Sequence, residues 1–252
     1  MKQKLLLTLI LWLALLGSAW AQSNNALHFS YATQNRVDIG AFAAGSPNFS
    51  QGFTFAGWVK FDQFKDLARV FTFAPSQADG SNNLMLSASG TTGLIMAEVN
   101  VDKVTSTKTL QTNKWYFLTL TVTSGGVTTI YVDGAAAASK TLTAPANIAR
   151  NTCYLGNSSY NEARGLNGSL DEVSIWSRAL SATEITGIMN GISSPTTQTG
   201  LLAYYTFNQG TAGGINTSVT TLTDATTNAK NGTLKDYTLS GTTSNWVAGF
   251  VA

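Results

Sequence analysis

The acidic residues of this chain are few, and their spacing decides whether it could hydrolyse a glycosidic bond. A retaining glycosidase holds two carboxyl groups about 5–5.5 Å apart, and an inverting one about 6.5–9.5 Å apart. Glu98, Asn100 and Asp102 alternate, so we expect them on one face of a strand. Because Asn100 takes the middle position, the two acids stand too far apart for the retaining mechanism. Glu98 and Asp102 are therefore weak catalytic candidates: an inverting arrangement stays open, and a solvated strand face is the simpler interpretation.

A second pair of acids, Asp171 and Glu172, lies in the segment Leu170–Trp176, which has the alternation of a strand. Neighbours in a strand point to opposite faces, so this pair does not form a catalytic site. The pattern places Asp171 on the same face as Val173, where a buried carboxylate must be paired, hydrogen-bonded or bound to metal. Arg178 or a backbone turn could satisfy it. Calcium, which takes six to eight oxygen ligands, is the alternative, so Asp171 is a tentative ligand for one calcium ion.

The residues best suited to binding a sugar lie in the loop 157–164. Sugars are held by an aromatic ring against the apolar face of a pyranose and by amide, carboxylate or guanidinium groups at the hydroxyls. Asn157, Tyr160, Asn161 and Arg164 supply this combination. Loops on a rigid scaffold commonly carry binding sites, so these four residues are our candidate ligand contacts. An ordinary polar surface loop is the alternative.

The strand Leu170–Trp176 leads directly into a predicted helix. Ser181 stands three residues before Glu184, so side chain and backbone can cap each other reciprocally at the helix start. Gly191 and the proline that follows at position 195 mark its end.

The rest of the chain consists of short segments with strand character separated by turn residues. Ser124-Gly125-Gly126 and Asp133-Gly134 indicate two hairpins, and Phe53–Phe61 carries large side chains on both faces, as an inner strand does. The other predicted strands are Arg69–Phe73, Leu84–Ser87, Leu94–Val101, Trp115–Thr123, Val127–Asp133, Ala135–Leu142 and Tyr154–Gly156. This spacing predicts an all-β, two-sheet antiparallel jelly-roll sandwich with one short helix.

The segment Gly168–Ile185 resembles a motif of LamG-like jelly rolls in the concanavalin A-like lectin/glucanase superfamily, roughly G-x-[IL]-D-[DE]-[VF]-x-[IV]-[WY]-x-R-x-L-[ST]-x-x-E-[IL]. Phe53–Val59 and Trp115–Gly134 agree with it, and the resemblance extends over about 26–191. It implies a concanavalin A-like fold, which hosts lectins, adhesion modules and glycosidases alike. Relatives have Asp-Gly where this chain has Ser30 and Tyr31, and that aspartate is usually assigned to calcium binding.

The ends of the chain differ from this central part. Residues 1–21 contain Lys2 and Lys4, an apolar run and Ala19-Trp20-Ala21, which together are typical of a signal peptide cleaved after Ala21. An uncleaved anchor is the alternative, although the apolar run is short for a membrane span. The jelly roll is expected over 22–191. Residues 192–252 have too few apolar residues for a core of their own, so we expect an extension packed on the jelly roll, or else a flexible tail.

Charge and composition exclude several partners. Without the two signal-peptide lysines the net charge is zero, and the other basic residues are scattered, so nucleic acid is not expected. The single cysteine, Cys153, cannot form an internal disulfide, and the single histidine, His28, lies far from it in sequence. We therefore expect neither a zinc site nor a Cys–His nucleophile, and we expect a monomer.

Three functions follow from these observations. The first is a secreted, non-catalytic module that binds a glycan or another extracellular partner. The second is a glycoside hydrolase acting on a β-glucan-type polysaccharide through Glu98 and Asp102. The third is a structural or adhesion protein of the cell envelope or matrix.

Overall fold

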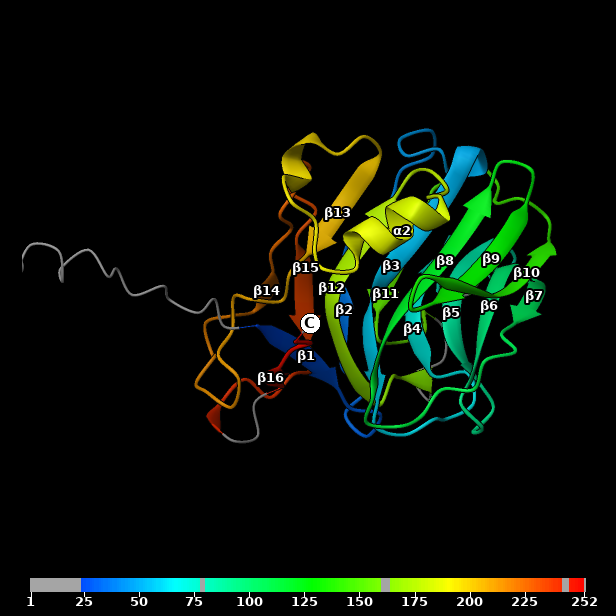
Figure 1. The fold of residues 1–252 in the computed structure, drawn as a ribbon. Helices are drawn as coiled ribbons and strands as arrows, with labels where there is room; N and C mark the ends of the chain where they lie inside the picture. The colour runs from blue at the N-terminus through cyan, green and yellow to red at the C-terminus, as the bar shows by residue number, and fades with distance from the viewer. Residues whose placement is uncertain (1–23, 78–79, 160–163, 242–244, 252) are drawn as a thin grey trace, which may run out of the picture.

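A computed structural model describes residues 24–77, 80–159, 164–241 and 245–251 (Figure 1). The predicted signal peptide, residues 1–21, lies outside the described residues, as do Tyr160 and Asn161. No helix in the described ranges is long and apolar enough to cross a membrane.

The strands form two antiparallel sheets of eight strands each, which confirms the predicted jelly-roll sandwich. Sheet A runs, edge to edge, through β10 (Ala135–Thr141), β9 (Val127–Val132), β8 (Trp115–Thr123), β3 (Gly52–Phe61), β12 (Gly168–Trp176), β1 (Asn25–Phe29) and β16 (Trp246–Ala248), with β13 (Leu201–Tyr205) also paired to β12. Sheet B runs through β14 (Thr221–Leu222), β15 (Gly232–Lys235), β2 (Arg36–Asp38), β11 (Thr152–Leu155), β4 (Arg69–Ala74), β5 (Asn83–Ser89), β6 (Leu94–Asn100) and β7 (Asp102–Thr105).

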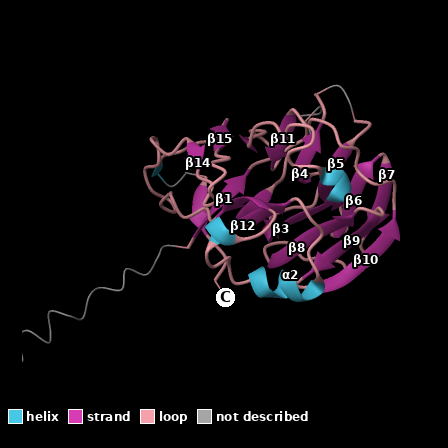
Figure 2. Ribbon diagram, turned by 90° about the horizontal axis from the view of Figure 1, so that it is seen from above, coloured by secondary structure: helices cyan, strands magenta, loops and turns pink. Residues whose placement is uncertain are grey.

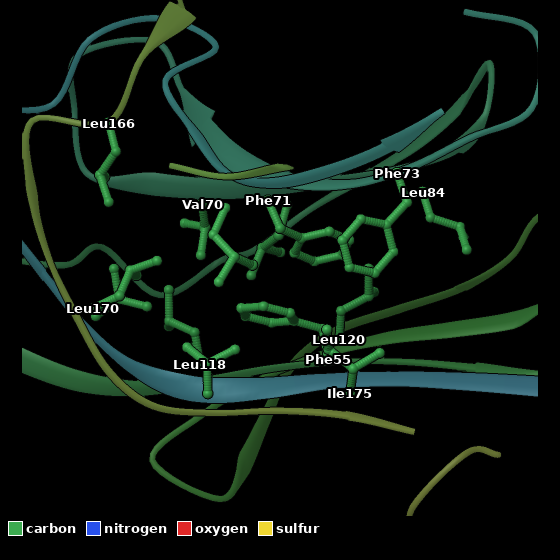
Figure 3. Close-up of a cluster of buried hydrophobic side chains, with 14 of the residues drawn as sticks. Phe55, Val70, Phe71, Phe73, Leu84, Leu118, Leu120, Leu166, Leu170 and Ile175 are labelled. Atoms are coloured by element: carbon green, nitrogen blue, oxygen red, sulfur yellow. The ribbon is translucent and has the colours of Figure 1, made fainter. Parts of the chain in front are cut away.

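The main core lies between the two sheets (Figure 3). Alternate residues of each strand point inward, so aromatic and aliphatic side chains of the two sheets meet. Phe55 of sheet A stacks on Phe71 of sheet B with 4.3 Å between ring centroids. Leu118 and Leu170 are fully buried in the same layer. Burying one such side chain contributes about 1.5–3 kcal/mol, so this layer dominates the stability of the sandwich.

The helix α2 (Ala182–Ile188) packs on the outer face of sheet A, on the side away from sheet B (Figure 2). Both hydrogen bonds of the predicted capping box are formed between Ser181 and Glu184, which confirms the helix start. A second apolar cluster, including Trp58 and Trp176, fills the space between helix and sheet. In the described part of the chain α2 is the only α-helix, beside the short 3-10 turns η1 (Phe49–Gln51) and η3 (Pro195–Thr197).

A β-bulge in β12 overturns the predicted alternation around Asp171. Glu172 has a φ of +51°, and the pairing with β3 shifts register between Asp171 and Ser174. As a result Leu170 and Val173 both point into the main core, whereas Asp171 lies opposite Trp58 on the outer face of sheet A. The prediction that Asp171 shares a face with Val173 is therefore wrong, because the bulge inserts an extra residue between them.

The segment after α2 adds strands to both sheets. The strand β13 pairs with β12, β16 pairs with β1, and β15 pairs with β2. Tyr205, Leu222 and Trp246 from this segment are buried in the main core. The described residues beyond 200 thus complete the sandwich at the edge formed by β1 and β2.

Candidate functional site

The outer face of sheet B carries a row of polar and aromatic side chains. Along each strand, the residues that alternate with core positions point outward, and on neighbouring strands these outward residues are paired side by side. One row crosses the sheet in the order Asp38, Tyr154, Thr72, Met85, Glu98 and Lys103. We call this surface, together with the neighbouring Arg69 and Ser87, the sheet-B face.

Several polar side chains of the sheet-B face are buried. Arg69, Thr72 and Ser87 are at most 1% exposed, and Glu98 is 8% exposed. Among the described residues, the hydroxyl oxygens of Thr72 and Ser87 find no hydrogen-bond partner. Buried hydroxyl groups are nearly always hydrogen-bonded in folded proteins, so two unpartnered ones on neighbouring strands call for an explanation.

Tyr154 is the aromatic residue of this row. The guanidinium of Arg36 lies over its ring, 5.1 Å from the centroid, and Gln77 Nε2 donates to its hydroxyl over 3.4 Å. These contacts hold the ring beside Thr72, its partner on β4. The face therefore combines an aromatic ring with hydroxyl, carboxylate and guanidinium groups, the combination that binds hydroxyl-rich ligands.

The two weak catalytic candidates do not form a pair. Asn100, with a φ of +59°, begins a tight turn. After the turn β7 starts at Asp102 and runs antiparallel to β6. Glu98 receives Lys103 Nζ at 3.3 Å, whereas Asp102 Oδ2 accepts hydrogen bonds from the backbone and hydroxyl of Thr143. The prediction that Glu98 and Asp102 share a strand face is wrong, because after the turn Asp102 pairs with Val99, a core residue, whereas Glu98 pairs with Lys103 on the outer face.

The next carboxylate in the same row is too distant to replace Asp102. Asp38 lies on β2, four strands from Glu98 on β6. At about 4.8 Å per strand this separation is about 19 Å, well beyond the range of either glycosidase mechanism.

The predicted ligand loop is only partly visible in the described residues. Asn157 is buried; its amide donates to the Gln34 carbonyl over 2.8 Å and its side-chain oxygen accepts from Ser158 N. Its amide therefore anchors the loop to the connection between β1 and β2. Arg164 is half-buried, and Tyr160 and Asn161 lie outside the described residues. Asn157, whose side chain is engaged in these contacts, and Tyr160, Asn161 and Arg164 stay predicted ligand contacts.

Asp171 is satisfied by backbone donors on the far side of the sandwich. Its carboxylate accepts from Glu172 N at 2.9 Å and from Phe250 N at 2.8 Å. Burial raises the pKa of Asp171 to about 8, with a smaller contribution from the neighbouring Glu172 and against the lowering effect of the two backbone donors. Arg178, which could have paired with Asp171, instead binds Glu184 at 2.7 Å.

The two contacts of the Asp171 carboxylate are N–H donors and supply no ligand for a calcium ion. Calcium needs several oxygen ligands, whereas Asp171 faces two N–H donors, and no group of three His, Cys, Asp or Glu occurs within the described ranges. Calcium binding by Asp171 stays a prediction.

The single cysteine and histidine lie in unrelated settings. Cys153 points into the core, its thiol donates to the Arg150 carbonyl, and burial raises its pKa to about 12. His28 Nε2 instead contacts Asp62 at 2.8 Å.

Sequence reasoning missed the residues that make the sheet-B face, above all Arg69, Thr72 and Tyr154. The period-two pattern of the strands carried a signal, because polar residues alternate with core residues in β4 and β5. The strand order, which places β11 next to β4, was also needed to predict that these residues lie on one face.

This fold and the polar outer face of one sheet define the class of protein. The chain belongs to the Laminin_G_3 family of the concanavalin A-like lectin/glucanases superfamily, whose model matches residues 18–186. A search of curated proteins gave no match.

Solved structures share the architecture. A proposed carbohydrate binding protein from Bacteroides ovatus has a TM-score of 0.61 and 22% identity, over 84% of this chain and 58% of that chain. The native heptameric SAP-like pentraxin from Limulus polyphemus has a TM-score of 0.52 and 14% identity, over 69% of this chain and 86% of that chain. At these identities the likeness shows a common fold, and this chain spans little more than half of the Bacteroides protein.

Proposed function

We propose that this protein is a carbohydrate-binding module and that the sheet-B face holds the sugar. The observation that carries the proposal is the pair of buried, unpartnered hydroxyls of Thr72 and Ser87. Both oxygens are almost inaccessible to solvent, so a sugar hydroxyl, which both donates and accepts, could complete them only once the side chains that cover them move aside. Leaving them unpaired costs stability, which a binding site can tolerate.

The surrounding side chains support the same ligand class. Tyr154, which is 8% exposed, brings an aromatic ring, and Glu98 and Lys103 form an ion pair towards the opposite end of the row. Both signs of charge are present, so the chemistry suits a hydroxyl-rich ligand better than a polyanion. The Bacteroides ovatus structure, itself described as a proposed carbohydrate binding protein, agrees with this assignment at the level of fold.

The proposed role is non-catalytic and extracellular. The register of β6 and β7, which places Glu98 and Asp102 on opposite faces of sheet B, supports binding rather than hydrolysis. The leader-like sequence of residues 1–21 supports secretion, which would bring the module to glycans outside the cell.

Binding to a glycan array, followed by calorimetric titration of the retained glycans, tests the proposal. Tyr154→Ala should weaken binding at least tenfold, because it removes the one aromatic ring of the row, next to Thr72. The matched control is Tyr131→Ala, which removes a half-buried tyrosine from β9 of the other sheet. Equal affinity of wild type and Tyr154→Ala, or no retained glycan at all, would contradict the proposal.

A further inference from the structure

A cavity of about 720 Å³ is lined by residues of β12, β13 and the segment that follows α2. Its walls include Asn24, Glu172, Asn190, Ser193, Tyr204 and Thr206. A smaller cavity of about 100 Å³ adjoins it, with Glu172 shared by both. We call the larger one the Glu172 cavity. It lies on the sheet A side of the sandwich, opposite the sheet-B face.

The Glu172 cavity arises from the bulge in β12. The positive φ of Glu172 turns its side chain out of the strand, and the Tyr204 hydroxyl donates to its carboxylate. The same hydroxyl accepts from Ile192 N at 3.1 Å, which ties the segment after α2 to the wall of the cavity. Burial raises the pKa of Glu172 to about 7, so near neutral pH its carboxyl group can donate as well as accept.

The rim of the cavity offers further polar groups. Asn24, Asn190 and Ser193 are exposed, and between described residues their side chains form no hydrogen bond; the Ser193 backbone carbonyl accepts from Gln198 Nε2 over 3.3 Å. Ile192, Pro195 and Ala225 add apolar surface to the wall. The lining contains no lysine, arginine or histidine, so it offers an anionic ligand no counter-charge.

We propose that the Glu172 cavity is a second carbohydrate site, which binds a neutral sugar. Amides, a hydroxyl and one carboxyl group converge on a cavity whose size falls in the range of about 300–1,000 Å³ typical of small-ligand sites. Apolar wall residues can receive the hydrogen-bearing face of the ring. Most of the lining comes from residues beyond 186, outside the part of the chain that matches the family.

Two sites on opposite sides of the sandwich would let one molecule bridge two glycan chains. Simultaneous engagement of both sites raises the apparent affinity for a polysaccharide above that of either site. The second site does not depend on the first, and the two can be tested separately.

Hydrogen–deuterium exchange of the whole protein with saturating cellotriose, xylotriose or arabinotriose tests the second site. We expect at least one of these neutral sugars to protect peptides spanning 187–208, and sialyllactose, which is anionic, to leave them unprotected. Ser193→Trp, which places a bulky ring at the rim, should abolish the protection. Thr183→Trp puts the same ring on exposed α2, lines neither cavity, and should leave the protection intact.

Tyr154→Ala separates this inference from the proposed function. Protection of 187–208 should persist in Tyr154→Ala even where binding at the sheet-B face is lost. No protection of 187–208 by any of the three sugars would overturn the inference, as would protection that survives in Ser193→Trp or disappears in Tyr154→Ala.

Discussion

The buried carboxyl group of Asp171 should make the stability of this protein fall as the pH rises. Its pKa is raised from an ordinary 3.8 to about 8 by burial, so the folded protein binds a proton that the unfolded chain releases. The stabilisation is fully present below about pH 4 and is lost as the pH rises to about 8. At about 1.4 kcal/mol per pH unit the full loss is on the order of 5 kcal/mol, an upper limit because Glu172 titrates in the same region.

Asp171→Asn isolates this contribution. The amide cannot ionise, but it leaves one of the two backbone donors, Glu172 N or Phe250 N, without an acceptor, at a cost of about 1–3 kcal/mol. The variant should therefore be less stable than wild type at pH 5 and more stable at pH 9. Urea unfolding at both pH values measures the difference.

The control is Asp236→Asn, which changes a carboxylate that is 63% exposed. Its stability should follow that of wild type across the same range. If the curves of wild type and Asp171→Asn ran parallel from pH 5 to pH 9, Asp171 would not be a buried protonated acid.

Two further substitutions test the local structure around β12. Ser181→Ala removes the cap of α2 and should lower the free energy of unfolding by about 1 kcal/mol in urea titrations; an unchanged value would mean that the capping box contributes nothing. Gly57→Ala would place a Cβ 2.8 Å from Val173 Cγ2, inside the bulge, and should cost about 1–3 kcal/mol by the same measurement. A stable Gly57→Ala would show that the bulge has room to relax.

The fold could be predicted because its signals are local. The capping box of Ser181 and Glu184, the Gly-rich hairpins and the alternation of Phe53–Phe61 each depend on residues close in sequence. The bulge at Glu172 is different, since it arises where β12 meets Gly57 of β3, more than a hundred residues earlier. No pattern within Leu170–Trp176 reveals it.

The candidate site could not be predicted for the same reason. Thr72 and Tyr154 become neighbours only because β11 inserts between β2 and β4, an order that local sequence does not specify. Asn157 looked like a ligand contact, but its amide is used by the Gln34 carbonyl, a contact between loops far apart in the chain. A site made of residues on adjacent strands can therefore be predicted only after the order of the strands in the sheet is known.

The central claim is that unpartnered hydroxyls on the sheet-B face are kept for a sugar, and Thr72→Val tests it most directly. Valine keeps the shape of the buried side chain and removes only the hydroxyl. We predict that the variant is as stable as wild type, or more stable by up to about 1 kcal/mol, and binds the tightest array glycan about tenfold more weakly. Unchanged affinity, or a clear loss of stability, would contradict the account.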